Sequence, residues 1–145
     1  MASEVETRPW HEQLALDDAA YREQLRYLFA RSAFYREKLS EAGVDRPEAG
    51  GGLDEITRLP LTEKSELRAT VTESNPVGAH LCAERSEIVR IYSTSGTTGA
   101  PSYIPLTAGD LQNWVTGSAR SYAASGARPG ERIDAVSGGC LRRHR

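Results

Sequence analysis

Hydroxyl and glycine residues lie close together between positions 93 and 99, and these residue types at this spacing can bind an anion. Gly96 and Gly99 allow backbone conformations that other residues rarely adopt, so the chain can approach a ligand closely. The hydroxyl groups beside them add donors to those of the backbone amides. A phosphate chain is the natural ligand of such a loop. The candidate phosphate-binding residues are Thr94, Ser95, Gly96, Thr97, Thr98 and Gly99.

Two other interpretations apply to this loop. Serine, threonine and glycine are common in turns, so the segment is also compatible with a purely structural hairpin loop. A Walker-type phosphate loop would need a lysine and the start of a helix directly after its last glycine. Ala100 and Pro101 occupy those positions, so neither requirement is met. The structural hairpin loop is therefore the alternative that stays open.

The loop and its flanks resemble a known enzyme family. Residues 95–101, with the sequence Ser-Gly-Thr-Thr-Gly-Ala-Pro, resemble the phosphate-binding signature of adenylate-forming enzymes. Three further segments resemble the N-terminal part of phenylacetate–CoA ligases and occur in the order typical of that family. The resemblance covers most of residues 21–133. The three supporting segments are residues 35–39, 59–68 and 88–91.

This resemblance implies an ATP-dependent, AMP-forming carboxylate–CoA ligase. In such enzymes a carboxylate attacks the α-phosphate of ATP to give an acyl-adenylate, and coenzyme A then accepts the acyl group. Positioning and charge stabilisation supply most of the catalysis. The resemblance implies that residues 94–99 hold the β- and γ-phosphates while Mg²⁺ bridges their oxygens, with Ser95 and Thr97 as the main hydroxyl donors. The implied cofactors and partners are ATP, Mg²⁺, coenzyme A and a small carboxylic acid. The sequence identifies neither this acid nor the catalytic residues.

One position departs from the family pattern. Many members have a lysine beside the loop proline, where this chain has Ala100 and Ser102. Neutralisation of the phosphates would therefore depend on amides, hydroxyls, Mg²⁺ or a base from elsewhere in the fold.

The length of 145 residues fits one ordinary domain but is far shorter than this family requires. The resemblance implies that the adenine pocket, the acyl pocket and the catalytic lysine of a mobile domain belong to further segments. We therefore expect a truncated N-terminal fragment that is inactive alone. The alternatives are a non-catalytic phosphate-binding domain and a degenerate gene product.

The formal charge of −2, with 26% charged residues, is typical of a soluble cytoplasmic protein and offers no basic surface for nucleic acid. The sequence contains no apolar run near the ~18 residues of a membrane span, and its acidic start is unlike a signal peptide. We therefore expect a cytoplasmic protein without a membrane partner.

Cys82 and Cys140 form neither a metal nor a disulfide pattern, the histidines lack ligand spacing, and no metal ligand is assigned.

Residues 1–86 are predicted to be mostly helical. Apolar residues recur at helical spacing over 21–39, and Asp17 or Asp18 is a fair N-cap. This pattern predicts one long amphipathic helix, or two with a break near Ser32. The aromatic residues on it are expected to fill a core, with a substrate pocket as the other interpretation.

Two shorter segments complete this helical region. The glycine-rich residues 44–56 predict a flexible connector that a protease would cut first. Thr62 is a plausible N-cap for a short helix that runs to about Val71.

Residues 87–136 have the pattern of a strand, the hydroxyl-rich loop, a second strand, a helix and a third strand. Thr107 and Asp110 form a near capping box where the helix begins. This order predicts an α/β fold, in which the helical N-terminal region precedes the incomplete β-sheet subdomain of an adenylate-forming enzyme. An incomplete sheet exposes an apolar face and an unpaired edge, which favours self-association. The expected strands are residues 88–92, 103–106 and 132–136.

Residues 137–145 differ in character from the rest. They lack an apolar period and end in four basic side chains. The caps, turns and periods of the preceding segments agree with one another, as in a sequence selected to fold. We therefore expect this tail to be non-native or disordered, and to result from truncation.

Overall fold

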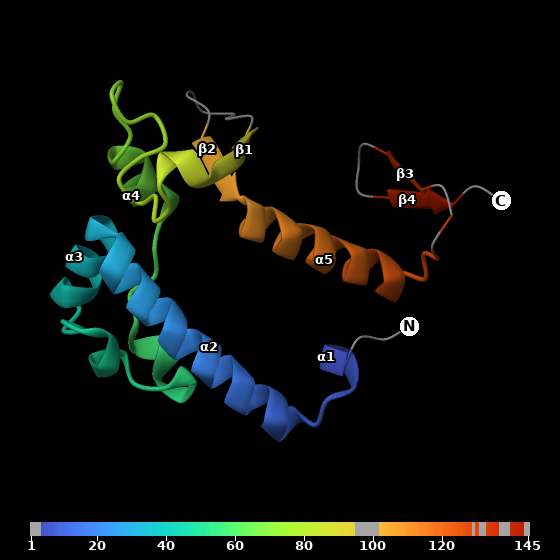
Figure 1. The fold of residues 1–145 in the computed structure, drawn as a ribbon, viewed down its shortest axis with the longest axis horizontal. Helices are drawn as coiled ribbons and strands as arrows, with labels where there is room; N and C mark the ends of the chain where they lie inside the picture. The colour runs from blue at the N-terminus through green and yellow to red at the C-terminus, as the bar shows by residue number, and fades with distance from the viewer. Residues whose placement is uncertain (1–3, 95–101, 129, 131–132, 137–139, 144–145) are drawn as a thin grey trace.

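The computed structural model describes residues 4–94, 102–128, 130, 133–136 and 140–143. Figure 1 shows α2 and α5 as two long helices, with α4 and the β1–β2 hairpin at the end where they approach each other. No helix in these described ranges is both long and apolar enough to cross a membrane. The elements, with η for 3-10 helices, are α1 (Glu4–Thr7), α2 (Trp10–Arg31), α3 (Ala33–Glu41), η1 (Pro47–Gly50), η2 (Leu53–Arg58), α4 (Lys64–Ala69), η3 (Arg85–Glu87), β1 (Ile88–Thr94), β2 (Ser102–Thr107), α5 (Ala108–Ala124), β3 (Ile133–Val136) and β4 (Cys140–Arg143).

The first long helical pattern forms two helices that break at Ser32. The backbone of Ser32 is extended, and its hydroxyl accepts a hydrogen bond from the Tyr35 amide at 3.2 Å. Ser32 therefore ends α2 and caps α3, which is the second of the two arrangements that the sequence allowed. Asp17 and Asp18 do not cap α2. That helix begins at Trp10, seven residues before Asp17, and the Pro9 carbonyl accepts hydrogen bonds from its first amides.

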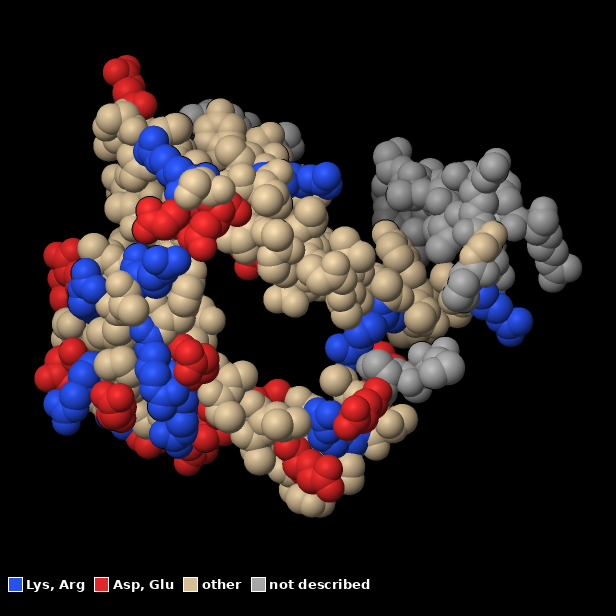
Figure 2. Space-filling model, in the orientation of Figure 1, with Lys and Arg blue, Asp and Glu red and all other residues tan. Residues whose placement is uncertain are grey.

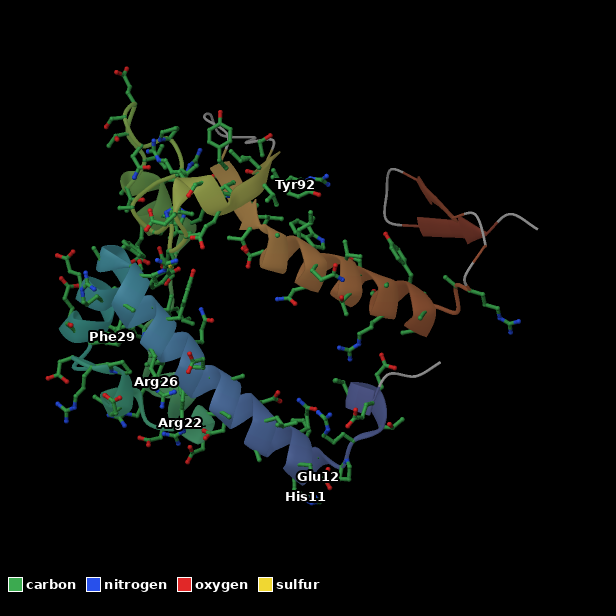
Figure 3. The ribbon with its side chains drawn as sticks, viewed as in Figure 1. His11, Glu12, Arg22, Arg26, Phe29 and Tyr92 are labelled. Carbon is green, nitrogen blue, oxygen red and sulfur yellow. The ribbon has the colours of Figure 1, made fainter. Side chains whose placement is uncertain are left out.

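A small core fills the space between α2, α3 and the 3-10 helices. Leu25 and Phe29 of α2 meet Leu39 of α3 and Val44 after it, and all four side chains are buried. Figure 3 shows Phe29 near the α3 end of α2, far from His11 and Glu12 at the start of the helix. Burial of apolar surface supplies the main stabilisation of this unit. The prediction that aromatic residues of this helix fill a core is confirmed for Phe29.

The glycine-rich segment forms η1 and η2, so the expectation of a flexible connector is wrong. The Tyr21 hydroxyl donates to the Gly50 carbonyl at 2.9 Å, and the Leu53 amide donates to Asp18 Oδ1 at 2.7 Å. Gly50 is buried against Leu25 and has no room for a Cβ. The glycines therefore permit close packing on α2 rather than motion.

The β1–β2 hairpin is antiparallel and pairs Ile88 with Thr107 at one end and Thr94 with Ser102 at the other. Helix α5 follows without a break. Its capping box is confirmed, because Thr107 Oγ1 accepts from the Asp110 amide at 3.2 Å and Asp110 Oδ2 accepts from the Thr107 amide at 2.9 Å. The hairpin and α5 thus form one continuous unit.

Helix α4 begins one residue later than the sequence predicts. Its N-cap is Glu63 rather than Thr62, and Glu66 completes a capping box by accepting from the Glu63 amide at 2.6 Å. The two glutamates therefore place the first turn of α4 at Lys64.

The third expected strand does not join the first two. β3 pairs with β4 in a separate antiparallel sheet, with Ile133 opposite Arg143 and Val136 opposite Cys140. A strand within 137–145 was not expected from the sequence. Within the described ranges the chain therefore has two separate hairpins. Each pairs strands that are close in the sequence, and closing a short loop costs little entropy.

Candidate phosphate-binding site

The β1–β2 hairpin brings the two ends of the hydroxyl-rich loop together. Thr94 ends β1 and Ser102 begins β2, and the Ser102 amide donates to Thr94 Oγ1 at 3.4 Å. Of the candidate phosphate-binding residues, Thr94 is described and is half-buried. The other five lie outside the described residues. They are Ser95, Gly96, Thr97, Thr98 and Gly99.

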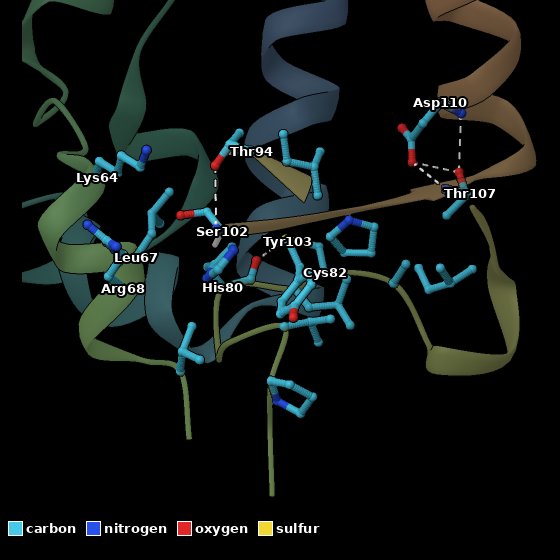
Figure 4. A pocket seen from close by; sticks show the side chains of 18 of the residues that line it. Lys64, Leu67, Arg68, His80, Cys82, Thr94, Ser102, Tyr103, Thr107 and Asp110 are labelled. Carbon is cyan, nitrogen blue, oxygen red and sulfur yellow. Dashed lines mark hydrogen bonds between the residues drawn. The ribbon is translucent and has the colours of Figure 1, made fainter. Parts of the chain in front are cut away.

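A cavity of about 820 Å³ lies beside these loop ends. Figure 4 shows that its wall comes from α4, the segment before η3, β2 and the start of α5. Most of the lining is apolar, while Thr94 and Ser102 bring hydroxyl groups to it. This composition is typical of a ligand pocket, in which a few polar groups orient a ligand within apolar walls. The apolar lining includes Leu67, Val71, Val77, Leu81, Ile104 and Pro105.

Two basic side chains of α4 line the same cavity. Lys64 and Arg68 are four residues apart, so they lie on one face of the helix. In Figure 4 the ammonium end of Lys64 points toward the side of the cavity that Thr94 and Ser102 line. These residues were not identified as site residues from the sequence. Their i, i+4 spacing ahead of the loop was the available signal, and they place two positive charges on the wall of this cavity.

The Ser102 hydroxyl is buried and has no hydrogen-bond partner among the described residues. Buried polar groups in native proteins almost always have a partner. This hydroxyl lies at the base of the loop and on the cavity wall. It therefore fits an oxygen-rich ligand such as phosphate, either directly or through water.

His80 and Cys82 also line the cavity, from the segment between α4 and η3. Burial lowers the pKa of His80, whose ring nitrogen lies 3.2 Å from Thr70 Oγ1. Burial likewise raises the pKa of the half-buried Cys82 thiol. The Cys82 thiol therefore stays protonated near pH 7 and is not activated as a nucleophile, while burial favours the neutral imidazole of His80.

Tyr27 connects α2 to this wall. Its hydroxyl donates to the Cys82 carbonyl at 3.3 Å, and its side chain lines the cavity. Tyr27 therefore lines the candidate site. This agrees with the second interpretation of the aromatic residues in the first long helix, namely that they contribute to a pocket.

Known proteins share this stretch of sequence and fold. No family model matches the chain. The phenylacetate-coenzyme A ligase of Thermus thermophilus is 39% identical over 127 residues, which are 88% of this chain and 27% of that protein. The enzyme of the same name from Escherichia coli is 31% identical over 134 residues, or 92% of this chain and 29% of that protein. The chain is a homologue of the N-terminal part of the phenylacetate-coenzyme A ligases.

Solved structures agree with this assignment. A 2-hydroxyisobutyryl-CoA ligase in complex with 2-HIB-AMP and CoA has a TM-score of 0.78 and 30% identity, over 88% of this chain and 27% of that chain. An open conformation of that ligase gives a TM-score of 0.77. The predicted fold class, the start of an adenylate-forming ligase, is confirmed. The chain spans little more than a quarter of the length of these two phenylacetate-coenzyme A ligases.

Proposed function

We propose that this chain is the phosphate-binding, N-terminal part of an ATP-dependent, AMP-forming carboxylate–CoA ligase. One observation carries the proposal. The hairpin that bears the Ser-Gly-Thr-Thr-Gly loop presents Thr94 and Ser102 to a cavity that Lys64 and Arg68 also line. Hydroxyl groups and two cations around one cavity are suited to a polyphosphate.

Two groups of residues have different roles in the proposed site: the loop binds the phosphates, and the basic side chains compensate their charge. The loop, residues 94–99, holds the β- and γ-phosphates through its amides and hydroxyls, with Ser95 and Thr97 as the principal donors. Lys64 and Arg68 offset negative charge that develops when the carboxylate attacks the α-phosphate. Bound Mg²⁺ would add further positive charge beside the phosphates. The described oxygen donors, Thr94 and Ser102, are hard ligands compatible with that ion or its waters.

The reaction class follows from the same groups. Hydroxyl groups and cations around the cavity position a phosphate chain and stabilise its charge, so the chain contributes positioning and electrostatic stabilisation to the reaction. The substrates would be ATP, a small carboxylic acid and coenzyme A. The protein would act in the cytoplasm.

A chimeric ligase tests this proposal. In the T. thermophilus enzyme, the stretch that matches this chain is replaced by this chain's own residues, and ATP–pyrophosphate exchange is measured with phenylacetate. We expect exchange that Lys64→Ala lowers by roughly 10-fold or more, as for loss of one charge-stabilising group. The matched control, Arg46→Ala, removes an exposed cation outside the cavity and should retain activity. A folded chimera without exchange, or equal activity in both variants, would contradict the proposal.

A further inference from the structure

Most residues of helix α5 are exposed, although the helix has almost no charge. None of its 17 residues is buried, and its charged residues are Asp110 and Arg120. Figure 2 shows an uncharged stretch of surface over α5, in contrast to the mixed charges over α2 and α3. A helix without a charged face normally lies in the interior of a larger protein.

An apolar stripe runs along this helix. Trp114, Val115 and Tyr122 expose 47%, 55% and 43% of their surface, and Leu111 and Ser118 continue their helical spacing. We call these five residues the α5 stripe. Trp114 packs against Tyr92 of the hairpin with ring centroids 4.9 Å apart, so the stripe continues onto β1. Exposed apolar patches of this kind mark interaction surfaces.

The neighbouring β1–β2 hairpin also exposes apolar side chains, and its strand edges are open. Its sheet has two strands, so β1 and β2 each have an edge without a partner strand among the described residues. Val89 and Ile91 of β1 expose 56% and 54% of their surface. An open edge and apolar side chains favour packing against further strands and helices.

The occupant must cover several sides of α5. A second copy of this chain, docked through a two-fold axis, would cover the stripe but leave the other uncharged sides of the helix in water. A larger partner covers them all. In the 2-hydroxyisobutyryl-CoA ligase, the matched stretch is 27% of the chain, so nearly three quarters of that chain lies outside it.

We propose that the α5 stripe is the surface onto which the remaining part of a ligase chain packs, making α5 an interior helix of the assembled enzyme. The choice of partner rests on the proposed function. Because Thr107 joins α5 directly to β2, the same contact fixes the hairpin and its loop against the remainder. This chain should therefore bind that remainder even when the two are not covalently linked.

A two-component binding experiment tests the proposal. The full chain with Trp10→Phe keeps Trp114 as its single tryptophan, since the sequence contains two. It is mixed with the segment of the T. thermophilus ligase outside the matched stretch. We expect a 1:1 complex by size-exclusion chromatography with light scattering. Trp114 emission should move to shorter wavelength, and its quenching by acrylamide should fall several-fold.

Two matched variants locate the contact. Val115→Asp places a charge in the stripe, whereas Ile56→Asp makes the same change at a 46% exposed side chain of η2. We expect Val115→Asp to weaken the complex by at least about 10-fold, because a buried unpaired charge is costly. Ile56→Asp should leave the affinity unchanged. Circular dichroism of each free variant confirms that α5 still forms.

Several outcomes would overturn the proposal. They are absence of a complex with the wild-type chain, equal effects of the two variants, and self-association through Trp114 that excludes the ligase segment. The proposed function fails independently, because a complex that forms but shows no ATP–pyrophosphate exchange leaves this interface intact. Addition of Thr97→Ala to the chain should not change the affinity.

Discussion

The buried side chains Leu25, Phe29, Leu39 and Val44 lie within twenty positions of one another, whereas α5 buries none of its side chains. The helical unit around α2 therefore completes a small core from its own short stretch of sequence. The hairpin and α5 carry the candidate phosphate site, but their apolar surface faces outward. The unit with its own core and the unit that carries the candidate phosphate site are thus different parts of the chain.

This division shows what each unit requires. The buried core beside α2 is formed by residues between positions 21 and 59. The candidate phosphate site instead combines groups from several elements, here α4 and the two strands beside the loop. Such a site becomes rigid only when the elements that carry it are themselves packed.

The largest expected effect concerns the loop. In the chimeric ligase, Gly96→Val should abolish turnover, because a branched side chain blocks the approach of phosphate to the backbone. Thr97→Ala should lower turnover by roughly 10- to 1000-fold, the range for losing one charge-stabilising donor. Both are measured as ATP–pyrophosphate exchange, with thermal unfolding as the control. Full activity in both variants would favour the structural hairpin loop.

The next largest effect concerns the core of the helical unit. Leu25→Ala should destabilise that unit by about 2–5 kcal/mol, because the buried side chain leaves a cavity. Chemical unfolding followed by circular dichroism measures this loss. The matched change Leu61→Ala, at a side chain that is 90% exposed, should cost far less. Similar losses at both positions would mean that the helical unit has no core of its own.

Features that depend on neighbouring residues could be predicted from the sequence, whereas features that depend on distant contacts could not. The Thr107–Asp110 capping box and the break at Ser32 depend on neighbours within three residues, so local patterns identify them. The order at 47–58 was missed because it depends on contacts of Asp18 and Tyr21 with residues 35 and 29 positions away. Composition indicates glycine but gives no sign of these partners.

The site shows the same limit. The loop was identified from residue types that lie side by side in the sequence. Lys64 and Arg68 precede the loop by some thirty residues, and only the packing of α4 beside the hairpin brings them to the same cavity. No local pattern connects the two segments.

A smaller effect should appear at acid pH. The Arg22 guanidinium and then the Leu53 amide lower the pKa of Asp18 below its usual value. A carboxyl whose pKa is lower in the folded state contributes stability that is present above its unfolded pKa, near 4, and is lost as the pH falls through the folded pKa. Asp18→Asn should therefore flatten the decline in stability below about pH 4, as measured by unfolding at several pH values. An unchanged decline would mean that Asp18 does not hold η2 to α2.

ATP–pyrophosphate exchange, measured on the full chain alone and on the same chain mixed with the complementary ligase segment, tests the division between the two units most directly. We expect the chain alone to give no exchange with phenylacetate above a heat-killed control, because the hairpin and α5 are incomplete without the remainder. The mixture should show exchange that Val115→Asp abolishes and Ile56→Asp does not. Clear exchange by the chain alone would contradict the conclusion that its chemical unit depends on the rest of a ligase.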